Sequence, residues 1–472
     1  MIVGRGRCVG GSGGFPPPPA ARPLRHARGQ ALALTLPLLA VLVVALWWAY
    51  DAGQAVTEKR RLAQTADALA LSAATWQSRA LNFDAYTNRA IIANEAAIAQ
   101  SVSLRGWSRY MNDLLLKTAV LTAWIPYVDA ATLSLQRLWA GLDRGLQPGL
   151  SAFEGMTTLV DQDIAAAQRA MHLATAEVVP ASIRESLQSG DSRVSLSVGG
   201  EAALIAWQVE WVRFASFYGG AWRWRQKDVL ERSLDGFTTR RNNTWRPLFG
   251  VDIVRLEKRG GTDLIGFDTW RALDTLSEHQ RRYVIFGRMR EQVPLVWAAV
   301  QSGIATAARG MHGNALQVNP AASRAALSSM RRDRIYRGLP SVWDLSAAQR
   351  AQFDPPRIPV RLVRRPASAG GAADVLGLRS VTALNGQEHV LQPASEPTSP
   401  PESTTSPADA MFAIAVSTSE FSRPSPRADA AIEKPNLYTP FWYSRMVAPT
   451  VPERVLMATL DGDPLWLASL PR

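Results

Sequence analysis

An uncharged stretch of twenty residues, 31–50, constrains this chain more than any other feature of its 472-residue sequence. At about 1.5 Å per residue, a helix of that length spans about 30 Å, which is the thickness of the hydrocarbon layer of a membrane. Trp47, Trp48 and Tyr50 end the stretch, where aromatic rings suit the headgroup interface. A buried core helix and a cleaved signal are the alternatives, but the apolar part of a signal usually has only about 7 to 15 residues. We therefore expect one uncleaved transmembrane helix over residues 30–50.

The residues before this stretch predict its orientation. Residues 1–29 contain five arginines, no acidic residue, a Gly/Ser run and four consecutive prolines, which is typical of a flexible basic arm. Asp51 and Glu58 accompany three basic residues after the stretch. Because cytoplasmic flanks carry the excess of Lys and Arg, we expect the arm to be cytoplasmic and the remaining chain to lie outside the cytoplasm.

Residues 51–118 predict a long alanine-rich helix with a heptad seam. One row of residues recurs every seven positions, and a second row of small or polar residues follows it by four. The first row is Leu62, Leu69, Trp76, Phe83, Ala90, Ala97 and Leu104, and the second is Ala66, Ala73, Ala80, Thr87, Asn94 and Ser101. We expect the helix-packing interface to be formed by Leu62, Ala66, Leu69, Ala73, Trp76, Ala80 and Phe83. A heptad alone does not distinguish a core helix of one domain from a seam that contacts another chain. If the seam contacts another chain, replacing Ala73 and Ala80 by leucine should disrupt assembly.

Three segments resemble the N-terminal region of Tad (Flp) pilus-assembly proteins of the TadE/TadG-like type. They are residues 28–39 (RGQALALTLPLL), 51–54 (DAGQ) and 62–74 (LAQTADALALSAA). The resemblance implies a bacterial inner-membrane protein that crosses the membrane once and has its bulk in the periplasm or outside the cell. It implies a minor pilin-like or accessory component of an adhesive pilus. The implied partners, reached through the heptad helix, are other pilus-assembly membrane proteins, pilins or a second copy of the chain.

A possible processing site lies at Gly29 and Gln30. In type IV-like prepilins a peptidase cuts after a glycine that precedes the apolar run, and a glutamate follows at the fifth position of the mature chain. Gly29 stands where that glycine would be, but Leu34 occupies the fifth position. Cleavage here would therefore depart from the usual pattern.

The remaining chain predicts an α+β fold, with a helical region at 119–249 followed by a β-rich region at 250–391. Its sheet is expected to be mostly antiparallel. The helical blocks expected are 119–146, broken at Pro126, then 151–178, 202–217 and 226–234. The strands expected are 251–256 and 262–266, joined by a hairpin at Gly260-Gly261, then 283–286, 358–363, 376–384 and 411–417. Residues 392–409, rich in Pro, Ser and Thr, predict a flexible excursion. Residues 410–472 predict a returning strand and an aromatic segment, 437–443, that covers the sheet.

The sequence predicts no catalytic, cofactor-binding or metal-ligating residues. Cys8 is the single cysteine, and the five histidines lack the common metal-site spacings. Trp222, Arg223, Trp224 and Arg225 alternate as in a strand with indoles inward and arginines in solvent, and this packing interpretation is favoured. The alternative is a membrane-tethered module in which they bind DNA or an acidic wall polymer, for which the net charge of +12 is suitable. A membrane-tethered hydrolase is a further alternative, which would need a buried polar constellation.

Overall fold

The computed structural model describes most of the chain after the basic arm. The residues described are 30–218, 223–247, 253–281, 287–305, 315–345, 355–365 and 410–462, without the side chains of 30–34. The chain divides into two compact units, Met1–Arg60 and Arg61–Arg472. The fold is α+β, as the sequence predicts: long N-terminal helices are followed by mostly antiparallel sheets.

Two long helices form an antiparallel pair. α1 runs from Gln30 to Thr122, and α2 runs from Val128 to Gln188. The break between them lies around Pro126, as expected, because proline disfavours a helical conformation of the residue before it. Two blocks predicted as separate, 119–146 and 151–178, instead fall largely on the single helix α2, which accommodates Pro148. Pro148 is exposed, so the carbonyl that its ring leaves without a partner can be hydrated.

In the described part of the second unit, shorter helices and three sheets complete the fold. The helices are α3 (Val198–Phe214), α4 (Trp224–Ser233), α5 (Gly236–Thr239), α6 (Ala315–Val318), α7 (Pro320–Ser328) and α9 (Val451–Leu460). A four-stranded sheet has the order β1 (Val194–Leu196), β9 (Arg357–Arg364), β10 (Met411–Phe421), β11 (Trp442–Val447). A five-stranded sheet has the order β3 (Asn243–Trp245), β4 (Val254–Ile265), β5 (Thr269–Arg281), β6 (Met289–Gly303), β7 (Arg331–Asp333). β2 (Ala215–Tyr218) pairs with β8 (Val342–Leu345). Among the described strands, every pairing is antiparallel except β6 with β7.

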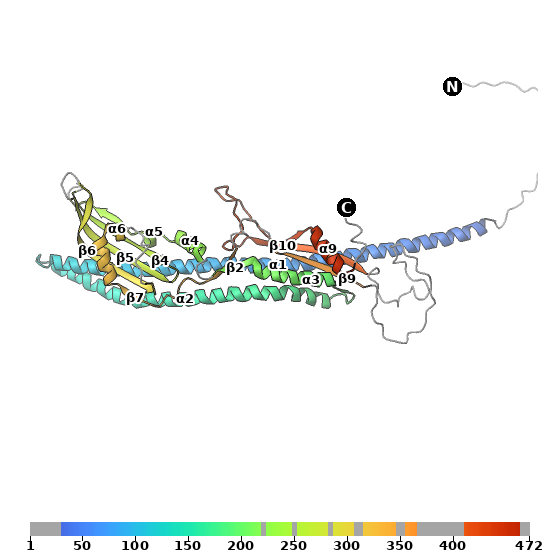
Figure 1. The fold of residues 1–472 in the computed structure, drawn as a ribbon, viewed down its shortest axis with the longest axis horizontal. Helices are drawn as coiled ribbons and strands as arrows, with labels where there is room; N and C mark the ends of the chain where they lie inside the picture. Colours follow the sequence, from blue (N-terminus) through green and yellow to red (C-terminus); the bar gives the residue numbers. More distant parts are fainter. Residues whose placement is uncertain are drawn as a thin grey trace, which may run out of the picture. The chain divides into compact units, whose positions relative to one another are not determined.

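The two larger sheets pack against different parts of α1. The four-stranded sheet shares a core with the α1 residues from Leu62 to Leu81 and with the later turns of α2. The five-stranded sheet shares cores with later α1 residues, including Ile98, Val102 and Tyr110. Within the second unit, Figure 1 shows β4, β5 and β6 close to the α1–α2 turn and β9 and β10 close to the other end of α2.

The predicted hairpin at Gly260-Gly261 is wrong. β4 runs through both glycines without interruption, and the chain reverses at residues 266–268 instead, where Gly266 has a φ of 65°. Gly260 pairs with Asp274 across the strands, and a Cβ at this glycine would overlap the buried Asp274 carboxylate. That carboxylate is paired with Arg241 at 2.9 Å and with Lys258 at 2.8 Å. The glycine therefore makes room for a buried ionic cluster and does not form a turn.

Other strand predictions had mixed outcomes. The strands expected at 358–363 and 411–417 are present as β9 and the first part of β10. The segment expected to cover the sheet, 437–443, instead runs into strand β11, with Leu437 and Trp442 buried and Tyr443 exposed. β5, β6 and α9 were not predicted. The expected strands at 283–286 and 376–384 and the Pro/Ser/Thr-rich segment 392–409 lie outside the described residues.

Candidate interaction surfaces

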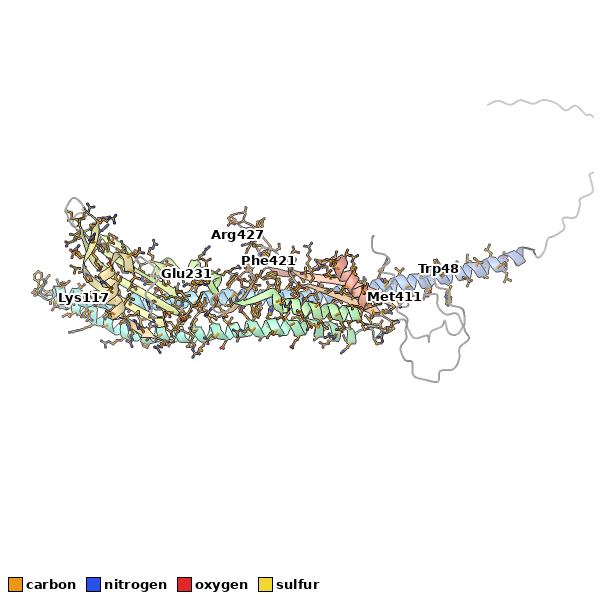
Figure 2. The ribbon with its side chains drawn as sticks, in the orientation of Figure 1. Trp48, Lys117, Glu231, Met411, Phe421 and Arg427 are labelled. Atoms are coloured by element: carbon orange, nitrogen blue, oxygen red, sulfur yellow. The ribbon has the colours of Figure 1, made fainter. Side chains whose placement is uncertain are left out.

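The first part of α1 has the length and composition to cross a membrane. It is the one helix with this property among the residues that the structure describes. Its large apolar side chains from Leu36 to Tyr50 are all exposed, and Figure 2 shows the Trp48 side chain projecting from this segment. Of the possible processing site, Gln30 is the first residue of α1, whereas Gly29 lies outside the described residues.

The seven seam residues pack inside the chain. Leu62, Ala66, Leu69, Ala73 and Ala80 are buried, Trp76 packs against the same core, and Phe83 is half-buried. They share this core with the later turns of α2, with α3 and with the four-stranded sheet. The seam therefore forms the core of one domain, which is the alternative that the heptad left open, and it is not an exposed surface for another chain. Because Ala66, Ala73 and Ala80 have small side chains, other elements of the same chain can pack closely against α1 at these positions.

Beyond Ala80, the second heptad row becomes a ladder of hydrogen bonds to α2. The Gln168 Nε2 donates to the Thr87 Oγ1 at 2.6 Å. Asn94 donates to Asp161 at 2.7 Å, and Ser101 donates to Glu154 at 3.0 Å. On both helices these residues recur every seven positions, so each step fixes the same antiparallel register. The α1 row is evident from the sequence, but the α2 row is not, because three polar residues at heptad spacing also suit a solvated face.

A buried ion-pair network continues this ladder toward the α1–α2 turn. Arg105 donates to both oxygens of Glu154, at 3.1 and 2.9 Å, and also pairs with Asp333 of β7. Burial raises the pKa of Glu154, and the Arg105 charge acts against this rise. Breaking such a pair by removing one partner leaves an uncompensated charge in the interior.

Further carboxyl groups are buried beside the ladder. Burial, together with the Asp161 charge, raises the pKa of Glu95 to about 8, although Trp270 and Tyr336 both donate to its Oε2. Burial also raises the pKa of Asp161 to about 7 and that of Asp84 well above its ordinary value. Neither oxygen of Asp84 has a hydrogen-bond partner within the described part of the chain. These groups are therefore suited to hold protons in the interior at neutral pH.

His172 lies in the same interior, between two indole rings. Its ring stacks on Trp211 at 4.6 Å and on Trp343 at 4.2 Å, measured between ring centroids. Burial lowers its pKa to about 4. The imidazole is therefore neutral at physiological pH and contributes to aromatic packing. Among the described residues there is no group of three or more His, Cys, Asp or Glu side chains arranged to hold a metal ion.

The predicted Trp/Arg strand is wrong, because Trp224 begins helix α4. Arg223 donates to the Leu339 carbonyl, and Arg225 pairs with buried Asp344 at 3.2 Å. Trp224 is largely exposed and packs edge-on against Phe267 at 4.9 Å. The alternation of Trp and Arg residues gave the wrong prediction because this segment enters a helix. Helix α4 buries Gln226 and Leu230, which are four residues apart, and leaves the Trp224 indole largely exposed. Trp222 lies outside the described residues.

A shallow hollow with a basic lining lies beside β3. It is lined by Arg240, Asn242, Asn243, Thr244, Arg259 and Val318. Arg259 already pairs with Glu257 at 2.7 Å and donates to Thr244. The Arg259 side chain is therefore already engaged within the sheet, and Arg240 is the second arginine of the lining.

The outward face of α2 is an apolar surface that was not predicted from the sequence. Leu135, Leu138, Leu142 and Leu146 are all exposed on a helix whose opposite side carries the polar ladder. Gly141, Gly145 and Gly149 lie along the same stretch. The signal that could have revealed this surface is the four-residue spacing of the glycines among leucines spaced by three or four.

Comparison with known proteins identifies one segment of the chain. Residues 29–77 match the family described as putative Flp pilus-assembly TadE/G-like. Neither a curated protein nor a solved structure matches the chain. The matched residues include the apolar stretch and the first five seam residues, up to Trp76. The N-terminal segment of this chain is therefore of the TadE/TadG-like pilus-assembly type.

Proposed function

We propose that this chain is a membrane-anchored minor pilin-like or accessory component of a Tad/Flp-type pilus-assembly system. It would act outside the cytoplasm by helix packing and scaffolding, with the arm of residues 1–29 in the cytoplasm. The observation that carries the proposal is the match of residues 29–77, because this segment begins the helix on which the remaining fold is built. The partners would be the inner membrane and other pilus-assembly proteins or pilins.

The buried groups support a scaffolding role in preference to a catalytic one. Glu95, Asp161 and Glu154 are fully buried between helices and sheet, and their hydrogen bonds go to neighbouring side chains of the same chain. A polar ladder of this kind specifies one register of a helix pair, as buried polar residues do in coiled coils. The chain would thus present a fixed framework to its partners.

The proposal predicts that native cells need this chain to make pili. Deleting it should remove pili counted by electron microscopy, and the intact chain supplied in trans should restore them. A matched variant in which residues 31–50 are replaced by an unrelated apolar helix of equal length tests whether the TadE/TadG-like sequence itself is required. Normal pilus numbers in the deletion strain would refute the proposal.

The position of the arm and its processing can be measured on the same cells. Because Cys8 is the single cysteine and lies in the arm, a membrane-impermeant maleimide should label it only after the inner membrane is permeabilised. Labelling of intact spheroplasts would place the arm outside and contradict the proposed orientation. A mature chain that starts at Gln30 would lose this label and would indicate entry into a filament, whereas a chain that keeps the arm would be a fixed anchor.

A further inference from the structure

The outward face of α2 is uncharged over nine helical turns. Its residues follow one another at intervals of three or four, which places them on one side of the helix. They are Val128, Ala131, Leu135, Leu138, Leu142, Leu146, Gly149, Phe153, Met156 and Val160, and all are exposed. Leu138 is 63% exposed and Met156 is 70% exposed. Arg137 and Arg144 lie outside this series and are turned away from it by the helical period.

Three glycines follow the edge of the same face. Gly141, Gly145 and Gly149 are spaced by four, and a Cβ at any of them would meet nothing within 4 Å. Glycine inside a helix is less favourable than alanine by about 1 kcal/mol. No packing contact within the described chain explains this cost. A row of glycines at this spacing lets the backbone of another helix approach closely.

The apolar area of the face matches that of a specific protein interface. From their exposed fractions, the large side chains of this face present roughly 700 Å² of solvent-accessible surface per copy, whereas a standard interface buries about 800 Å² per partner. Exposed apolar patches larger than a few hundred Å² are uncommon on monomeric proteins and mark contact surfaces. The face is therefore large enough to hold a partner by itself.

We infer that this face of α2 pairs with the same face of a second copy of the chain. A face without charge needs no complementary charges from its partner, and its leucines and glycines can meet their own counterparts. Copies with one membrane anchor share one orientation, so two copies are related by rotation about the membrane normal, and equivalent residues face each other near the axis. This step depends on the proposed anchoring, which the Cys8 label tests separately. Gly145 and Gly149 then lie where the two backbones come closest.

Disulfide cross-linking tests the pairing directly. In full-length protein carrying Cys8→Ser, expressed alone in bacterial membranes, Leu142→Cys should form a covalent dimer on mild oxidation. Arg144→Cys, two residues along the same exposed helix but on the other side, is the matched control and should give at least tenfold less dimer. Expression without other pilus components separates this result from the proposed pilus role. A monomeric Leu142→Cys protein, or equal cross-linking of both variants, would overturn the inference.

Glycine replacement gives a second, independent readout. Gly145→Leu with Gly149→Leu should keep the monomer folded, because both sites are open and leucine favours a helix, but should reduce the Leu142→Cys dimer at least tenfold. Arg144→Leu, the control, also introduces a leucine, but on the side of α2 that faces away from the apolar face. It should leave the amount of Leu142→Cys dimer unchanged. Undiminished cross-linking in the double variant would refute close approach at the glycines. In native membranes, an oxidised adduct that lacks a second copy by mass spectrometry would assign the face to another protein and reject self-pairing.

Discussion

Glu95 should make the stability of this protein fall as pH rises through the neutral range. Its side chain is fully buried, its Oε2 accepts hydrogen bonds from Trp270 at 3.2 Å and Tyr336 at 2.8 Å, and its pKa is raised from 4.5 to about 8. The folded state therefore holds a proton that the unfolded state releases above about pH 4.5. Because the folded state binds more protons in this range, the free energy of unfolding must decrease with pH.

The expected size of the effect follows from the width of this window. One unit of pKa shift corresponds to about 1.4 kcal/mol, so Glu95 alone lowers the free energy of unfolding by about 4 kcal/mol between pH 5 and pH 8. Asp161, with a pKa of about 7, adds a decrease over part of the same range. His172, whose pKa is lowered to about 4, has the opposite effect below about pH 6.5. Replacing Glu95 alone leaves Asp161 and His172 in place and removes both the titration of Glu95 and its coupling to Asp161.

Glu95→Gln keeps an oxygen acceptor for Trp270 and Tyr336 but cannot ionise. The free energy of unfolding of variant and wild type can be measured by urea unfolding of the full chain in detergent, followed by tryptophan fluorescence. Relative to wild type, the variant should become more stable by about 4 kcal/mol as the pH rises from 5 to 8. Any constant packing cost of the amide cancels in this comparison. Glu177→Gln, at an exposed glutamate of α2, should leave the pH profile unchanged. The reasoning would be refuted if the difference in unfolding free energy between Glu95→Gln and wild type varied by less than about 1 kcal/mol from pH 5 to pH 8.

Three further changes test other parts of the fold by thermal or urea unfolding. Tyr127, in the α1–α2 turn, has a φ of 68° and is 91% exposed, so Tyr127→Gly should stabilise the chain by about 1 kcal/mol, and a loss would show that the ring contributes contacts. Arg105→Met leaves Glu154 buried without its cation and should cost about 3 to 5 kcal/mol, so a cost below about 1 kcal/mol would contradict the importance of the network. Ala73→Leu and Ala80→Leu add volume to the core and should each cost about 1 to 3 kcal/mol, whereas unchanged stability would show that these sites tolerate overpacking.

The heptad pattern predicted the seam of α1 and its helical extent, but not where each row leaves the core. Ala90 and Leu104 of the first row are exposed, whereas Asn94 and Ser101 of the second row contact α2. A straight helix drifts by about 20° per heptad relative to a strict seven-residue repeat, so a row that begins in the core rotates out of it after several heptads. Sequence spacing alone does not show which row stays covered, because that depends on the position of α2.

The β-rich region was harder to predict because its core contains polar residues. β5 is buried on both faces, yet it includes Arg271 and Asp274. Arg271 is held by Gln301 of β6, and Asp274 by Arg241. These partners are about thirty residues away in the chain, so neither alternation nor local propensity reveals that the charges are satisfied. The Gly260-Gly261 pair was misinterpreted for the same reason, since the carboxylate for which Gly260 makes room lies on the next strand.

The α1–α2 pair reverses the usual distribution of side chains on one of its helices. Between residues 135 and 168, α2 directs Asp161, Glu154 and Gln168 toward α1 and exposes leucines on its other side. A polar ladder specifies register, but its net contribution to stability is small, because each buried carboxyl must be desolvated or hold a proton. The apolar area that would ordinarily stabilise such a helix is thus left on the outside. A partner that covers this face would supply the missing hydrophobic burial while leaving the internal register intact, so pairing should raise the stability of α2 without changing how it meets α1.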